Sequence, residues 1–86
     1  MDSYAITFAR PARKDLQALQ HDLAGRILAV IEELAEEPRP AGCRKLRNSR
    51  DLWRVRVGDY RVVYRVDDRD KTVDVVIVRH RSDVYR

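Results

Sequence analysis

A predicted β-hairpin centred on Gly58-Asp59 is the feature that most restricts what this chain can fold into. Residues 52–57 and 60–66 alternate in character on either side of this dipeptide. Two alternating runs separated by a Gly-X loop are a strong hairpin signal, and a two-residue loop pairs Val57 with Tyr60 and then fixes every further pair. Successive side chains of a strand point to opposite faces, so the register predicts one apolar face and one basic face.

The two predicted faces differ in chemistry. The apolar face suits packing against helices and carries the cross-strand pairs Val57/Tyr60, Val55/Val62 and Trp53/Tyr64. The other face carries the pairs Arg56/Arg61, Arg54/Val63 and Leu52/Arg65. Like charges directly opposite one another destabilise a sheet, and the planar fork of arginine suits phosphate. We therefore predict that this face binds a polyanion, with a charge-rich solvated surface as the plain alternative.

The rest of the chain predicts helices that pack on this sheet. Residues 3–8 alternate like a half-buried strand. Apolar residues recur at helical spacing over residues 11–19, and again after Asp22, the expected N-cap of a second helix that ends before the prolines at 38 and 40. The apolar run 72–78 predicts a central strand buried on both faces, joined to the hairpin by a polar turn at 67–71.

These elements define an α+β fold, with residues 1–86 forming a single domain. Two N-terminal antiparallel helices pack on a small, mainly antiparallel β-sheet in the order β-α-α-β-β-β. Residues 44–47 are either one extra edge strand or a loop. A chain of 86 residues is long enough for one modest core and too short for two.

Charge and composition narrow the classes of function. The net charge is +4, but residues 44–86 carry 13 basic and 7 acidic side chains, whereas residues 1–43 carry 5 and 7. A basic, strand-rich half is the footprint of a nucleic-acid-binding face. The single cysteine, Cys43, has no partner for an intramolecular disulfide, and we expect it to be a buried packing residue. Because the sequence also has no long apolar span, we expect a cytoplasmic protein without a membrane partner. The histidines and the cysteine are not spaced like metal ligands, so we expect no metal site. The sequence also has no glycine-rich phosphate loop, and we expect no cofactor.

The candidate functional residues combine phosphate binding, proton transfer and base stacking. The set is Arg54, Arg56, Arg61, Arg65, Arg79, His80, Arg81 and Tyr85. Histidine titrates nearest neutrality and is the natural proton-transfer group, although a histidine at a strand end is often structural. Tyr85 either stacks on an unpaired base or anchors packing. Together these groups are what RNA cleavage without a metal requires.

The sequence resembles the RelE/ParE toxin superfamily of bacterial toxin-antitoxin systems. The resemblance spans the chain and rests on Lys45-Leu46-Arg47, on the run from Leu52 to Tyr64 with its Gly-Asp-Tyr-Arg-Val-Val-Tyr core, and on His80-Arg81-Ser82-Asp83-Val84-Tyr85. It implies two helices on an antiparallel sheet, a cognate antitoxin as partner, and, for RelE-type members, ribosome-dependent endoribonuclease activity that cuts mRNA in the A site without metal.

The resemblance also implies roles for individual residues. Arg54 and Arg56 match the basic pair on the strand before the hairpin loop, Arg61 the arginine that stabilises the scissile phosphate, Arg79 a later catalytic arginine, and Tyr85 the tyrosine that stacks on or orients the cleaved nucleotide. Further RNA contacts are expected from Lys45, Arg47, Arg65 and Arg81.

One departure from the family pattern matters for the chemistry. The best-known RelE pattern has lysines where this chain has Arg54 and Arg56, and arginine does not lose its proton in proteins. We therefore assign the general base to His80, with Tyr85 as the alternative. Two other functions stay open: a ParE-like toxin that inhibits DNA gyrase without cleaving RNA, and an inactive relative that only binds RNA or an antitoxin.

Overall fold

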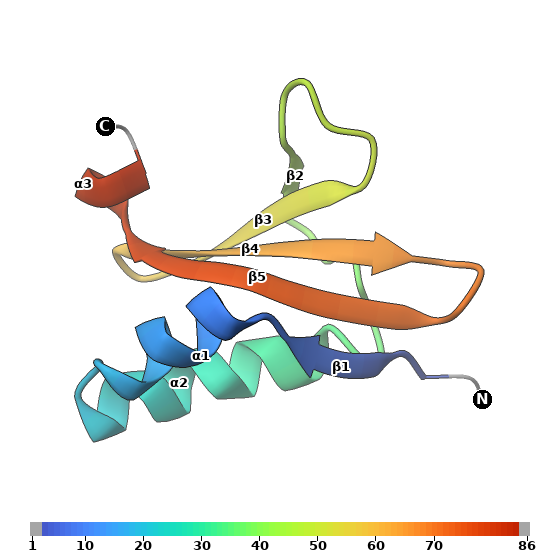
Figure 1. Cartoon of the computed structure of the whole chain (residues 1–86). Coiled ribbons are helices and arrows are strands. Elements are labelled where there is room, and N and C mark those ends of the chain that lie inside the picture. The colour runs from blue at the N-terminus through green and yellow to red at the C-terminus, as the bar shows by residue number, and fades with distance from the viewer. Residues whose placement is uncertain (1–2, 85–86) are drawn as a thin grey trace.

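The computed structural model describes residues 3–84 as one sheet with helices on both of its sides (Figure 1). The elements are β1 (Ala5–Phe8), α1 (Arg10–Gln17), α2 (His21–Glu33), β2 (Arg44–Lys45), β3 (Leu52–Val57), β4 (Tyr60–Asp67), β5 (Thr72–His80) and α3 (Arg81–Val84). The predicted order is confirmed, and the extra edge strand exists as the two-residue β2.

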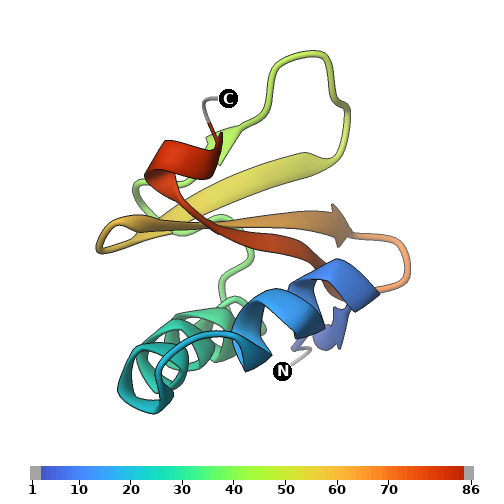
Figure 2. The ribbon, with the colours of Figure 1, turned by 60° about the vertical axis from the view of Figure 1, so that its left-hand side comes forward.

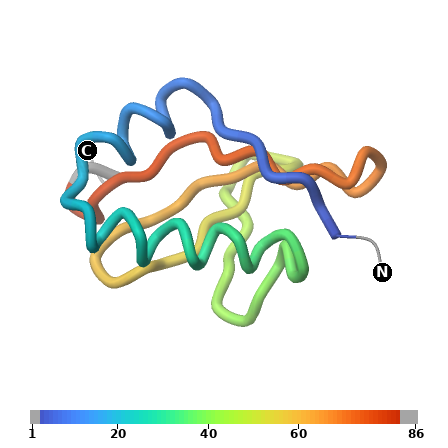
Figure 3. Tube along the Cα trace, turned by 90° about the horizontal axis from the view of Figure 1, so that it is seen from below, coloured from blue at the N-terminus to red at the C-terminus, as the bar shows by residue number. Residues whose placement is uncertain are grey.

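The sheet has the strand order β1-β5-β4-β3-β2. β1 pairs with β5 in parallel, and the other three pairings are antiparallel. Seen from the helical side, α1 lies along β5 and α2 runs alongside it on the β3 side of the sheet (Figure 3). The α+β fold class is therefore confirmed.

The hairpin forms with the predicted register, from Val57↔Tyr60 to Leu52↔Arg65. Gly58 has a φ of +61°, a conformation that a side chain disfavours, and Asp59 has no positive φ. A positive φ at the first loop position alone is the requirement of a type II′ turn, whose twist matches that of the flanking strands.

The core lies between the apolar face of the sheet and the two N-terminal helices. Ala12 from α1 and Ile27, Ile31 and Leu34 from the α2 region are at most 1% exposed. Their partners on the sheet are Val55, Val57, Val62, Tyr64, Val66, Val73, Val75 and Val78. Trp53, expected in the core, is only half-buried at the margin, where the guanidinium of Arg39 lies 5.1 Å from its ring centroid.

Two local expectations were wrong. Asp22 is not the N-cap of α2, because the helix begins one residue earlier and Gln20 occupies the cap without a side-chain hydrogen bond. β5 is not buried on both faces either, since Val76 and Ile77 are only partly buried. The reason is that α1 and α2 cover only one face of the sheet (Figure 1). The strand also contains a bulge: Val63 pairs with Ile77 but Tyr64 pairs with Val75, so Val76 is an extra residue on β5.

Candidate functional site

Three arginines form a continuous row across the sheet on the face opposite the core. Arg56 of β3 pairs with Arg61 of β4, and Arg61 pairs with Arg79 of β5. Directly paired residues share a face, and the neighbours of Arg61 on β4, Val62 and Tyr60, point to the helical side. We call Arg56, Arg61 and Arg79 the arginine row.

The bulge in β5 is what brings Arg79 into the arginine row. Val73 and Val75 face the core, so strict alternation would turn residue 79 to the core as well. The extra residue, Val76, reverses the alternation, and from there on Val78 faces the core while Arg79 faces outward.

The members of the row differ in how far they reach into solvent. Arg56 is exposed, and 45% of the Arg79 side chain is accessible, whereas Arg61 on the middle strand is 7% exposed. α3 lies on the same side of the sheet, opposite α1 and α2, and packs against β4 and β5 (Figures 1 and 2). Arg61 is therefore the least accessible of the three, with the more exposed Arg56 and Arg79 on either side of it.

A second pair of arginines lies beside the row. Arg54, one alternation step from Arg56 on β3, pairs with Arg44 of β2. Arg44 was missing from the predicted site, whereas Lys45, which was included, pairs with Trp53 and shares its face instead. The register of β2 decides which of Arg44 and Lys45 lies on the face of the row, and the hydrogen bond from the Leu46 amide to the Leu52 carbonyl fixes that register.

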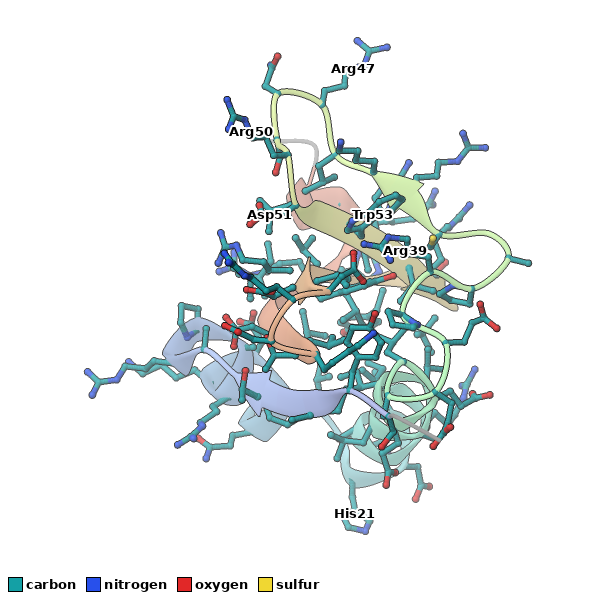
Figure 4. The ribbon with its side chains drawn as sticks, turned by 90° about the vertical axis from the view of Figure 1, so that its right-hand side faces the viewer. His21, Arg39, Arg47, Arg50, Asp51 and Trp53 are labelled. Atoms are coloured by element: carbon teal, nitrogen blue, oxygen red, sulfur yellow. The ribbon has the colours of Figure 1, made fainter. Side chains whose placement is uncertain are left out.

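The other predicted phosphate ligands lie around this face. Arg65 pairs with Leu52 and forms a 3.0 Å ion pair with Asp51, which offsets part of its charge. Arg47 is exposed on the β2–β3 loop, which projects away from the helical end marked by His21 (Figure 4). Arg81 is exposed at the start of α3, and its amide donates to the Asp59 carbonyl at 2.8 Å.

His80 is not brought to the arginine row. It pairs with Tyr60 on the helical face, and the two rings make an edge contact with centroids 5.3 Å apart. The Ser82 amide donates to Nδ1 of His80 at 3.2 Å, and the Ser82 hydroxyl oxygen lies 2.9 Å from the same nitrogen. Tyr85, the other candidate for proton transfer, lies outside the described residues.

The shifted carboxyl and phenol groups lie away from the row. Two hydrogen bonds from Arg39 and one from Tyr4 stabilise the Asp68 carboxylate and lower its pKa to about 2. Burial raises the pKa of Tyr64, whose hydroxyl donates to the Pro38 carbonyl at 2.7 Å. These contacts connect the 38–39 loop to β4 and to the β4–β5 turn, and that turn to Tyr4 just before β1, so they are structural.

Other sites on the molecule are limited. Within residues 3–84, no group of three His, Cys, Asp or Glu side chains is placed to hold a metal ion, and no helix there is long and apolar enough to cross a membrane. An open cavity of about 550 Å³ lies at the end of α2 and is lined by Glu33, Glu36, Glu37, Pro40 and Ala41. Its acidic lining makes it a poor site for phosphate, in contrast to the face of the sheet that carries the arginine row. Cys43 is partly buried.

Comparison with known proteins places the chain in a family. A family model described as the ParE toxin of type II toxin-antitoxin systems, parDE, matches residues 6–85. The chain belongs to this toxin family. It is 39% identical to toxin RelG of Mycobacterium tuberculosis over 96% of its own length and 97% of that protein.

Solved structures share the fold of this toxin. A chain of the archaeal RelE–RelB complex from Pyrococcus horikoshii matches with a TM-score of 0.81 at 32% identity, covering 92% of this chain and 96% of that one. The isolated RelE toxin of Escherichia coli matches with a TM-score of 0.80 at 30% identity, covering 96% and 92%. The expected membership of the RelE/ParE superfamily is therefore confirmed, and the protein is a toxin of a toxin-antitoxin module.

Proposed function

We propose that this toxin is an endoribonuclease that cleaves mRNA in the ribosomal A site without a metal ion. The observation that carries the proposal is the arginine row, in which three permanently charged guanidinium groups occupy paired positions across adjacent strands. Like charges at directly paired positions repel one another. A phosphodiester compensates for that repulsion, and its oxygens match the geometry of the guanidinium fork.

Charge stabilisation is the part of the reaction that the row supplies. In the proposed reaction the 2′-oxygen, as it loses its proton to a base, bonds to the adjacent phosphorus to form a cyclic phosphate, while the bond from phosphorus to the 5′-oxygen of the next nucleotide breaks and that oxygen takes up a proton. Negative charge gathers on the phosphate oxygens during this exchange, and fixed donors aimed at that charge stabilise the transition state. In the proposed complex, Arg61 contacts the phosphate from below while Arg56 and Arg79 contact it from the sides. Arg54 and Arg44, one step along the strands, hold the neighbouring part of the RNA backbone.

Proton transfer has two candidates, His80 and Tyr85. For His80 to act as the base, its ring has to leave Tyr60 and its Nδ1 has to release the Ser82 amide. We therefore expect Tyr85→Phe to lower single-turnover cleavage on programmed ribosomes more than His80→Ala does. The reverse order of effects assigns proton transfer to His80, and equal, small effects assign it to neither residue.

An antitoxin encoded with the toxin is the proposed protein partner. RelE proteins of Pyrococcus horikoshii and Escherichia coli, both similar in fold to this chain, have been crystallised with RelB antitoxin. A partner that neutralises an RNA-cleaving site benefits from acidic groups that cover the arginine face. Binding to the ribosome places the toxin in the cytoplasm.

Inhibition of DNA gyrase is the second candidate. It is favoured by the match to a family model named for ParE, the class that the gyrase alternative invokes. The arginine row argues for the nuclease, because a protein that only blocks gyrase has no evident need for three facing guanidinium groups.

Primer extension on mRNA from cells that express the toxin tests the proposal, in parallel with a supercoiling assay on purified gyrase. We expect cuts at codon-spaced positions within translated reading frames, and intact supercoiling. Supercoiling inhibition with intact mRNA assigns the gyrase function instead. No effect in either assay refutes both functions and leaves a toxin homologue that only binds RNA or antitoxin.

A further inference from the structure

One carboxylate, that of Asp15 on α1, contacts β5 beyond the end of its pairing with β1. β1 pairs with β5 only from Thr72 to Val75. Three residues further along, the Val78 amide donates to Oδ2 of Asp15 at 2.9 Å, and Nε of Arg79 donates to the same oxygen at 3.2 Å.

We propose that Asp15 is a positioning residue that orients Arg79 for phosphate binding. This inference rests on the proposed function, because it assigns a part in the same site. The contact uses Nε and leaves the terminal Nη groups of Arg79 to face the phosphate beside Arg61, its partner in the register. The hydrogen bond to Nε restricts the orientations of the planar guanidinium, and a restricted orientation favours two-point contact with a phosphate.

The environment of Asp15 makes it a firm anchor. Its side chain is 20% exposed, whereas the carboxylates of the Arg65–Asp51 and Arg39–Asp68 pairs are 48% and 56% exposed. The Val78 amide fixes the carboxylate independently of the arginine, and α1 itself is fixed by Ala12, which is fully buried. An arginine held in this way loses less rotamer freedom when it binds RNA than an unrestrained one.

Asp15 also lowers the repulsion within the row. Its carboxylate forms an ion pair with Arg79, with Nε of the arginine 3.2 Å from Oδ2, and so offsets part of the positive charge of the row. The carboxylate approaches from the edge of the sheet, so it offsets charge on Arg79 without occupying the face on which RNA would lie.

A purely structural role, as a cap on the edge of β5, is the rival explanation, and Asp15→Asn separates the two. Asparagine keeps an oxygen that can accept from the Val78 amide but removes the charge that holds the guanidinium. We expect a fall of about 3- to 10-fold in the single-turnover cleavage rate, the range of one weakened hydrogen bond. Asp68→Asn is the matched control, because it makes the same change in a 2.7 Å ion pair with Arg39, remote from the row.

A double-mutant cycle tests whether Asp15 acts through Arg79. In the Arg79→Ala background, Asp15→Asn should change the remaining cleavage rate by less than about 2-fold. An equal loss in both backgrounds, or no loss in the wild-type background, overturns the proposal.

A second readout does not depend on cleavage. The Nε–H resonance of Arg79, observed by ¹⁵N NMR, should shift in Asp15→Asn and stay in place in Asp68→Asn. A trinucleotide RNA with a 2′-deoxy central residue should then bind several-fold more weakly to Asp15→Asn than to the wild type. An unmoved Nε–H resonance, or equal affinity of the two proteins for the RNA, refutes the role of Asp15. If instead the wild-type toxin leaves mRNA on ribosomes intact, only the nuclease function is refuted.

Discussion

Replacing Arg56 by glutamine should make the toxin more stable and less active. Arg56 is exposed on β3 and faces Arg61 directly. Two unit charges about 7 Å apart in water repel by about 0.6 kcal/mol, and cross-strand pairs span about 0.2–1 kcal/mol. We therefore expect Arg56→Gln to raise the free energy of unfolding by about 0.5–1 kcal/mol at low salt, which raises Tm by about 2–8 °C for a domain of this size.

Cleavage should change in the opposite direction. A hydrogen bond from a charged donor contributes about 1.5–3 kcal/mol, so losing the phosphate contact of Arg56 lowers the single-turnover rate by about 10- to 150-fold. Cleavage of mRNA on programmed ribosomes measures this loss, and urea unfolding followed by Trp53 fluorescence measures the stability. Arg13→Gln, which removes an exposed arginine from α1, is the matched control for net charge.

Salt dependence shows whether repulsion is the cause. The Debye length falls from about 30 Å at 0.01 M salt to about 3 Å at 1 M, so the stability gained by Arg56→Gln should disappear at high salt. A gain that persists at 1 M salt, or that Arg13→Gln reproduces, refutes the repulsion argument. A gain in stability without loss of cleavage refutes the assignment of the row to phosphate.

Three further predictions follow from individual contacts. Tyr64→Phe removes the hydroxyl that donates to the Pro38 carbonyl and should lower the free energy of unfolding by about 1–2 kcal/mol, measured in urea. Because the pKa of Asp68 is lowered from 3.8 to about 2, its contribution is complete above pH 4 and is lost as the pH falls through 2, so stability should fall less steeply over that interval in Asp68→Asn than in the wild type. Arg44→Gln and Lys45→Gln make the same charge change on opposite faces, and only the first should lower cleavage several-fold; equal losses would show that the net charge of β2 matters and its register does not.

The part of the site that could be predicted from sequence is the part fixed by the hairpin loop. A two-residue loop leaves no freedom in pairing, so the register of Arg56 and Arg61 followed from Gly58-Asp59 alone. Arg44 was missed because β2 is two residues long and a six-residue loop, 46–51, separates it from β3. No turn chemistry in a loop of that length dictates which of two adjacent basic residues faces outward.

The start of α2 shows a similar limit. Asp22 has the strongest capping preference in its segment, but capping contributes only about 1 kcal/mol, and packing of the helix on the sheet outweighs it. The helix consequently begins at His21, and Asp22 lies in its first turn, where its charge interacts favourably with the helix dipole.

The bulge in β5 reconciles two demands that strict alternation would oppose. The core needs Val73 and Val75 to face the helices, and the site needs Arg79 to face away from them, although all three positions are odd-numbered. Without an extra residue, a guanidinium would enter the apolar core, where an unpaired charge is costly. The apolar run from Val75 to Val78 is the sequence feature that accompanies this reversal of alternation. Val75 and Val78 face the core, whereas Ile77 pairs with Val63 on the opposite face. In this sheet the apolar run accompanies a bulge and not burial on both faces, and the bulge sets the face on which Arg79 lies.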